Sequence, residues 1–349
     1  MLLLVALALG APPEPILNLP VDPPLGPYQT VAFTATEGTW MNLDVSPDGA
    51  TIAFDLLGHI YVLPRVGGVA TPLTQGHAWN MHPRFSPDGA RLAFTSDRGG
   101  GDNLWVMNVD GSDAHAVSDE SFRLVAQPDW TPDGRWVFGR KHFTDTRSLG
   151  TGEIWAWDPA GGTDGVAWTE KGHSEADVNE PAISPDGRYL YMSEAGPFQY
   201  NRNVYAGIYA ITRVDLLTGE SRDEVRGPGG ACRPQVSPDG ALLGYLRRDL
   251  GGQRDVWVVR DLATGREREV FDHLDRDQQE TWSLHGTYPT WSWLPDGTGA
   301  VFYADGGLWE VDLAGRARQI PFSAPVSRPV EPAVRQPHPI PPPDQQARV

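Results

Sequence analysis

Ser46-Pro47-Asp48-Gly49 is the first of six closely related tetrapeptides, and their repetition decides the fold. The tetrapeptides recur at intervals of 40 to 57 residues along most of the chain. Internal repetition with such a period is typical of a solenoid or a propeller. The other five are Ser86-Pro87-Asp88-Gly89, Thr131-Pro132-Asp133-Gly134, Ser184-Pro185-Asp186-Gly187, Ser237-Pro238-Asp239-Gly240 and Leu294-Pro295-Asp296-Gly297.

The tetrapeptide has the chemistry of a tight turn. Proline is preset for the second turn position, aspartate suits the third, and glycine accepts the positive φ that is needed where the chain re-enters a strand. A serine or threonine at the first position can hydrogen-bond to the turn backbone. Turn geometry accounts for the six aspartates, so we predict no metal site at them.

Each turn is followed by an apolar strand, a second apolar strand and a short glycine turn into a last strand. Such segments fit sheets that are buried on both faces between neighbouring blades. Six repeats of four strands predict an all-β fold, a six-bladed β-propeller of four-stranded antiparallel blades. Residues 31–34 are expected to pair with the last blade and close the ring. Aromatics at matching positions should form the core: Phe54, Phe94, Phe138, Tyr191, Tyr245 and Phe302, followed by Tyr61, Trp105, Trp155, Tyr209, Trp257 and Trp309.

The propeller is expected to span residues 30–322 of a chain of 349. Residues 1–11 are almost purely apolar and end in small residues, as a secretory leader does, although the basic start of such a leader is missing. A stretch this short cannot cross a bilayer as a helix, so a membrane span is the weaker interpretation. Residues 12–29 form a proline-rich lead-in, and residues 323–349 are expected to be an extended proline-rich tail or linker. We therefore expect a periplasmic or otherwise extracytoplasmic location.

The composition excludes some partners and some chemistry. The formal charge is −17, with 28 basic and 45 acidic residues, so nucleic acid is repelled and is not expected as a ligand. The one cysteine, Cys232, allows no intramolecular disulfide and no thiolate metal cluster. No His-x-His, His-Glu-x-x-His or Gly-x-Ser-x-Gly motif occurs. We predict no catalytic residue, metal or cofactor in this chain.

The two sets of short turns lie on one rim of a propeller, and the long, variable connections lie on the other. Loops that grow on one face of a rigid scaffold usually carry binding, so the loop-rich rim is the expected functional face. In five blades the innermost strand is expected to open with a residue followed by proline. These residues should form a polar ring at the mouth of the central channel: Asn42, His82, Gln127, Glu180, Arg233 and Tyr288.

Two interpretations of the ring remain open. Any residue at a wet channel mouth tends to be polar, and the prolines can simply start edge strands. Alternatively, the ring binds a peptide end or a small polar ligand, with Trp40, His77 and Trp79 above it. In that case Glu180 and Arg233 would recognise the two termini of a short peptide through charge-assisted hydrogen bonds.

The repeats resemble those of TolB-type, or PD40-type, propellers over nearly the whole chain. A closer resemblance is to the N-terminal propeller of large exported proteins with a C-terminal amidohydrolase domain, and it rests on residues 36–49, 54–58 and 94–98. That resemblance implies an adjoining metal-dependent hydrolase, whose ligand positions do not occur in this chain.

Three functional hypotheses follow. The first is an exported, non-catalytic propeller that binds peptides or protein partners on its loop-rich rim, as the N-terminal module of a larger amidohydrolase-type hydrolase. The second is a propeller enzyme with a metal-assisted site, or an acid–base site built on His82 and Glu180, at the channel mouth. The third is a periplasmic scaffold like that of the Tol system.

Overall fold

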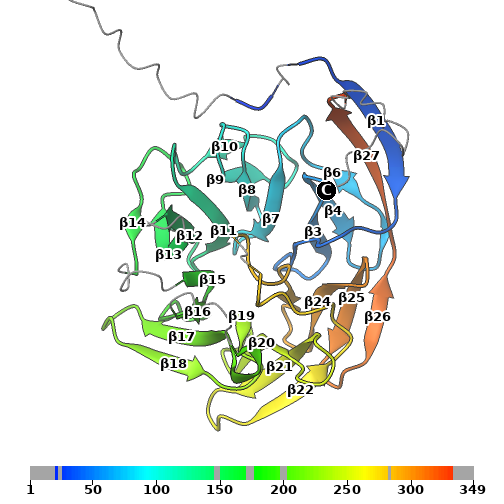
Figure 1. Ribbon diagram of the computed structural model, residues 1–349. Coiled ribbons are helices and arrows are strands. Elements are labelled where there is room, and N and C mark those ends of the chain that lie inside the picture. Colours follow the sequence, from blue (N-terminus) through cyan, green and yellow to red (C-terminus); the bar gives the residue numbers. More distant parts are fainter. Residues whose placement is uncertain are drawn as a thin grey trace, which may run out of the picture.

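The computed structural model describes residues 20–22, 26–144, 150–169, 177–196, 203–281 and 284–332. In this part of the chain, six four-stranded antiparallel sheets are arranged as blades around a centre (Figure 1). Each blade uses consecutive strands, so the six-bladed TolB-like propeller predicted from the repeats is confirmed. The expected leader and most of the expected tail lie outside the described residues.

The blades contain the following strands. Blade 1 is β2 (Leu43–Val45), β3 (Thr51–Leu56), β4 (His59–Pro64) and β6 (Thr71–Pro72), and blade 2 is β7 (Asn80–Phe85), β8 (Arg91–Ser96), β9 (Asn103–Asn108) and β10 (His115–Ala116). Blade 3 is β11 (Leu124–Trp130), β12 (Val137–Thr144), β13 (Gly150–Trp157) and β14 (Val166–Ala167). Blade 4 is β15 (Asp177–Ile183), β16 (Tyr189–Ala195), β17 (Tyr209–Asp215) and β18 (Ser221–Val225), with a 3-10 turn η1 (Val204–Ala206) before β17. Blade 5 is β19 (Cys232–Val236), β20 (Leu242–Arg248), β21 (Asp255–Asp261) and β22 (Glu267–Phe271), and blade 6 is β23 (Ser292–Trp293), β24 (Gly299–Ala304), β25 (Gly307–Asp312) and β26 (Ala317–Ile320).

The repeated tetrapeptide makes the turn that its residues predict. In the first copy, the Ser46 hydroxyl donates to Asp48 Oδ1 at 2.6 Å and accepts the Thr51 N–H at 2.9 Å. Gly49 has a φ of 71° and donates its N–H to the Ser46 carbonyl at 2.8 Å. The hydroxyl bond lowers the pKa of Asp48 and keeps it ionised as an acceptor.

The innermost strands differ from expectation at the residue before proline. In β7, β11, β15 and β19 this residue does not open the strand. It lies inside the strand at a β-bulge, where the pairing register shifts. Tyr288 lies ahead of β23. The bulge residues have a positive φ of 54 to 58°, which is uncommon for residues other than glycine: His82, Gln127, Glu180 and Arg233.

The ring closes through strands outside the six blades. β1 (Gln29–Ala35) pairs antiparallel with β27 (Phe322–Val330), and β27 pairs parallel with the short β5 (Gly68–Val69). Figure 1 shows β1 and β27 running side by side along the outside of blade 1. The expectation that residues 31–34 pair with the last blade is therefore wrong, because their partner is the strand that follows it.

The strand β27 also corrects the expected tail, whose first residues, 323–330, belong to the fold. Its prolines, Pro325 and Pro329, are four residues apart, so both nitrogens point to the same edge of the strand. Proline is accepted in a strand where its nitrogen does not face a partner carbonyl. A proline-rich composition therefore did not exclude a strand here.

The core lies between the blades and is rich in aromatic rings. The six aromatics of the second strands are all buried, as predicted. The largest cluster of the described residues joins blades 5, 6 and 1 with β27. Between blades 5 and 6, Trp291 stacks on Phe302 at 5.3 Å and Trp257 meets Trp293 edge-on at 5.4 Å between ring centroids. The described part of the chain contains no helix long and apolar enough to cross a membrane.

Phe322 anchors the closing strand, and its loss should open the ring. Its ring is buried, packs 5.3 Å from that of Phe54, and is followed on the same face by the buried Ala324 and Val326. Phe322→Ala should lower the free energy of unfolding by about 3 to 5 kcal/mol in urea titrations, because it leaves a cavity between β27 and blade 1. Val69→Ala, on the exposed β5, should change it by less than about 0.5 kcal/mol. Equal effects of the two substitutions would show that β27 does not help to close the propeller.

Candidate functional site at the channel mouth

The six predicted ring residues converge on the centre of the propeller, but their side chains are buried. At three of the four bulges, a side chain from the preceding blade accepts the backbone N–H of the residue before proline. The His82 N–H donates to Asp55 Oδ2 at 2.9 Å. The Glu180 N–H donates to Gln127 Oε1 at 2.5 Å, and the Arg233 N–H donates to Glu180 Oε2 at 2.7 Å. The ring therefore joins blades to each other.

Blades 6 and 1 are joined by a related arrangement. The Thr290 N–H donates to Asn42 Oδ1 at 3.0 Å, and the Leu43 N–H donates to the Thr290 hydroxyl at 2.8 Å. One layer deeper, Arg84 bridges Asp44 at 3.1 Å and Asp129 at 2.9 Å, which links three blades. These contacts fill the channel with polar side chains that satisfy one another.

The mouth of the channel is covered by residues 284–289, which we call the plug loop. It belongs to the link between β22 and β23, and this link reaches the middle of the ring in Figure 1. Glu180 Oε1 accepts the Thr287 N–H at 2.6 Å and the Thr287 hydroxyl at 2.9 Å. Arg233 donates to the carbonyls of Tyr288 at 2.6 Å and His285 at 3.0 Å.

The plug loop changes the expected role of Glu180 and Arg233. Their side chains lie 3.3 Å apart and are both nearly fully buried. Because each holds the other and the plug loop, neither is presented to a ligand at the mouth. With Gln127 they line a space of only about 30 Å³, enough for about two water molecules.

The other half of the predicted set does line a cavity. The channel-mouth pocket lies between blade 1, blade 2 and the plug loop and has a volume of about 290 Å³. Its predicted lining residues are Trp40, Asn42, Trp79, His82 and Tyr288. His77 is not among its lining residues; its carbonyl accepts a hydrogen bond from Arg328 of β27 at 3.0 Å.

The closing strand supports the wall of this pocket. Arg328 extends from β27, donates to the Ala78 carbonyl at 2.9 Å, and places its guanidinium 5.5 Å from the centroid of Trp79. Trp79 also covers Gly58, where an added Cβ would lie 2.7 Å from the indole ring. The closing strand therefore fixes the position of Trp79 as well as the ring.

Asp55 is the residue that the sequence prediction of the site missed. It accepts the Asn42 N–H at 2.9 Å and the Asn42 amide at 2.8 Å in addition to the N–H of His82. Burial raises its pKa to about 7 despite these three donors. A charged residue inside the otherwise apolar segment 52–56 was the available signal.

The histidines around the mouth are held in the neutral state. His82 donates from Nε2 to the His285 carbonyl at 3.1 Å, so its Nδ1 accepts from the Thr95 hydroxyl at 3.3 Å. Burial lowers the pKa of His82 well below its ordinary value and lowers the pKa values of His142 and His285 to about 4. Within the described residues, no three His, Cys, Asp or Glu side chains are grouped so as to hold a metal ion.

Comparison with known proteins agrees with the repeat architecture. Residues 29–195 match the family model described as TolB beta propeller domain. The chain is 26% identical over 234 residues to the uncharacterized peptidase YuxL of Bacillus subtilis. The matched region covers 61% of this chain and 31% of that protein. It is 35% identical over 91 residues to the uncharacterized protein Atu1656 of Agrobacterium fabrum (25% and 29%) and 33% identical over 89 residues to tricorn protease homolog 1 of Streptomyces coelicolor (26% and 8%). The matched regions thus span less than a third of the length of these relatives.

Solved structures show the same fold. TolB from Acinetobacter baumannii superimposes with a TM-score of 0.59 at 15% identity, over 82% of this chain and 65% of that one. A putative TolB from Agrobacterium tumefaciens gives 0.56 at 19% identity, over 78% and 96%. The chain therefore carries TolB-type propeller repeats and is distantly homologous to proteins named as peptidases.

Gly286 tests whether the plug loop depends on its contacts with the ring. It has a φ of 99°, and a Cβ there would lie 1.9 Å from a guanidinium nitrogen of Arg233 and 3.0 Å from Glu180 Oε1. Gly286→Ala should therefore displace the plug loop and increase amide hydrogen exchange at residues 284–289. Gly187→Ala is the matched control, since Gly187 has a φ of 73° and open space around it. If both variants exchange alike at the plug loop, the contact with Arg233 does not position it.

A buried carboxyl group beside the link between β22 and β23 predicts an unusual dependence of the free energy of unfolding on pH. Asp255 is 1% exposed, and neither carboxyl oxygen has a hydrogen-bond partner among the described residues. Burial, and next Asp277, raise its pKa well above the ordinary value of 3.8. Above pH 3.8 the unfolded chain ionises at this residue first, so the wild-type free energy of unfolding contains a term that falls as pH rises.

Asp255→Asn should remove that term. Its gain in the free energy of unfolding over wild type should begin above about pH 4 and should be larger at pH 8 than at pH 5 in urea titrations. Asp239→Asn is the control, because Asp239 lies in an exposed turn where a hydrogen bond from Ser237 lowers its pKa and gives the opposite sign. A gain that does not change with pH would mean that Asp255 is ionised in the folded protein.

Proposed function

We propose that this protein is a peptide-binding propeller, and that its channel-mouth pocket holds an apolar side chain of an extended peptide segment. The observation that supports this most directly is the division of the pocket into an apolar opening and a polar floor. Trp79 and Leu57 are each nearly half exposed at the opening, and Asn42, Asp55 and His82 lie below them. Mostly apolar clefts with a few fixed polar groups are the usual form of a ligand site.

The backbone at Leu57 supports a role in binding. Leu57 and Gly58 form the two-residue turn between β3 and β4, with φ values of 51 and 76°. Turns with two positive φ values prefer Asn, Asp or Gly at the first position, and the matching turn of blade 6 has Asp305 there, with a φ of 46°. An exposed leucine in this conformation costs stability, and strain of this kind is often retained at functional sites.

The geometry favours binding over an acid–base site built on His82 and Glu180. Both imidazole nitrogens of His82 and both carboxylate oxygens of Glu180 are engaged in the contacts described above. Proton transfer to a substrate would require the plug loop to leave. A binding role requires only the surfaces that the pocket already exposes.

The finer function that we propose is assistance to a hydrolase that cleaves amide bonds. The resemblance of the repeats to amidohydrolase-linked propellers supports it, as does the distant homology to YuxL and the tricorn protease homologue. Because the channel itself is filled, the propeller would bind substrate at its mouth and present it there. An exported location belongs to this proposal, since peptides are a common extracytoplasmic substrate.

Substitution at the pocket opening tests the proposal. Leu57→Asn should raise the free energy of unfolding by several tenths of a kcal/mol, because asparagine suits the turn. The same variant should weaken binding of a library of unstructured hydrophobic peptides by about tenfold, as should Trp79→Ala, measured by fluorescence polarisation. Val66→Asn, at an exposed turn on the opposite rim, should leave binding unchanged. Unchanged peptide affinity in both pocket variants would refute the assignment of the channel-mouth pocket.

A further inference from the structure

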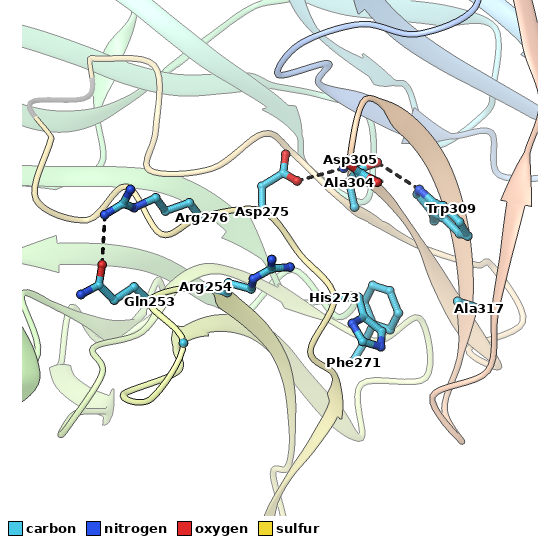
Figure 2. Close-up of a pocket in the computed structure, with 11 residues that line it drawn as sticks. Gln253, Arg254, Phe271, His273, Asp275, Arg276, Ala304, Asp305, Trp309 and Ala317 are labelled. Carbon is cyan, nitrogen blue, oxygen red and sulfur yellow. Dashed lines mark hydrogen bonds between the residues drawn. The ribbon is translucent and has the colours of Figure 1, made fainter.

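A second and larger pocket lies between blades 5 and 6. This inter-blade pocket has a volume of about 740 Å³, within the range of small-molecule sites. Three connections of the loop-rich rim form it: the β20–β21 loop, the start of the β22–β23 link, and the β24–β25 turn. Its chemistry rests on the six residues Arg254, Phe271, His273, Asp275, Asp305 and Trp309, which Figure 2 shows around the space.

One wall of the pocket is aromatic and fixed. The ring of Phe271 is buried against Phe302 and meets the imidazole of His273 edge-on, 5.7 Å between centroids. The Trp309 indole N–H donates to the Ala304 carbonyl at 3.0 Å, which holds the ring in place (Figure 2). A rigid aromatic wall provides an apolar side chain with contact area at little entropic cost.

A guanidinium without a carboxylate partner projects into the pocket. Among the described residues, the Arg254 side chain takes part in none of the ion pairs, although the protein carries a charge of −17. Figure 2 shows it extending between Asp275 and His273, whereas Arg276 turns away and donates to Gln253 Oε1 at 3.0 Å. The Arg254 backbone is fixed, since its carbonyl accepts the Asp249 N–H at 2.8 Å and Gln253 beside it has a φ of 54°.

The carboxylates on the side of the pocket opposite Arg254 restrict the kind of anion that can bind there. Asp275 Oδ1 accepts the Asp305 N–H at 2.9 Å, which orients the Asp275 carboxylate at the pocket edge. A dianion such as a phosphate monoester would be repelled by these carboxylates, whereas a single carboxylate can pair with the guanidinium. An N–H donor beside that carboxylate could in turn be accepted by Asp275.

We propose that the inter-blade pocket binds the C-terminal residue of a peptide, with its carboxylate on Arg254, its apolar side chain on Phe271 and Trp309, and its amide N–H toward Asp275. The C-terminal residue of a peptide carries a carboxylate, a side chain and an amide N–H on one Cα or next to it. Arginine suits this role because its planar fork can bind a carboxylate through two hydrogen bonds. This site is separate from the channel-mouth pocket, and its occupancy does not require that pocket to bind.

The experiment uses N-acetyl-phenylalanine as the probe, titrated into the full chain by calorimetry at low salt. The neutral N-acetyl-phenylalanine amide should bind at least about tenfold more weakly than the acid. Arg254→Gln should cause a similar loss and Arg254→Lys a smaller one, whereas Arg266→Gln, at an exposed turn on the opposite rim, should have no effect.

Three outcomes would overturn the proposal: equal affinity for acid and amide, unchanged affinity in Arg254→Gln, or tighter binding of phenyl phosphate than of the acid. N-acetyl-aspartate amide, whose carboxylate lies on its side chain, should bind weakly; binding as tight as that of the probe would contradict the C-terminal assignment. The Leu57 and Trp79 variants should retain full affinity for the probe. Loss of affinity there would place the probe in the channel-mouth pocket instead.

Discussion

A backbone N–H that leaves its own strand ladder must find another acceptor, and in this propeller the acceptor comes from the neighbouring blade. Three of the four bulges each turn out one such N–H, at His82, Glu180 and Arg233. Asp55, Gln127 and Glu180 accept them from the blades before. These bonds connect neighbouring sheets at the centre of the propeller, together with the ion pairs of Arg84 and the contacts of Thr290, and they add to the apolar packing between blades.

Two further features of the molecule depend on this ring. The plug loop has its position because the remaining hydrogen-bonding capacity of Glu180, Arg233 and His82 is directed toward residues 285–288. The closing strand β27 lies on the outside of blade 1, and its Arg328 side chain fixes Trp79 at the edge of the channel-mouth pocket. The strand that closes the ring therefore also holds one side of the channel-mouth pocket in place.

The sequence was informative where structure is local. The Ser-Pro-Asp-Gly turns specify themselves through bonds that span at most five residues, such as that from Thr51 to Ser46, so the blades could be counted in advance. The ring contacts between blades span from 27 residues, between Asp55 and His82, to 248 residues, between Asn42 and Thr290, and could not be read from any one repeat. Thus the sequence placed the six ring residues at the centre but could not tell that Glu180 holds Thr287, or that Asp55 belongs with them.

Proline occurs in two structural settings in this protein, and the amino-acid composition does not distinguish them. Before proline, the expected strand start is a bulge with positive φ, because tertiary hydrogen bonds compensate a conformation that is locally unfavourable. In β27, Pro325 and Pro329 remove two donors from the same strand edge and still allow pairing with β1 along seven residues. The first residues of the predicted tail, 323–330, form a strand, and the sequence could not predict it because the partner strand lies almost 300 positions earlier, at Gln29–Ala35.

The two pockets of the loop-rich rim have no lining residue in common, but both are lined by parts of the link between β22 and β23. The Tyr288 hydroxyl lies at the channel-mouth pocket, donates to the Tyr303 carbonyl at 2.8 Å and accepts the Asp275 N–H at 3.3 Å. Asp275 in turn lines the inter-blade pocket. The backbone at Asp275 is therefore linked by a single hydrogen bond to Tyr288, which belongs to the plug loop. Because Asp275 and Arg276 of this link line one pocket and His285 and Tyr288 line the other, the described parts of the link contribute to the shape of both.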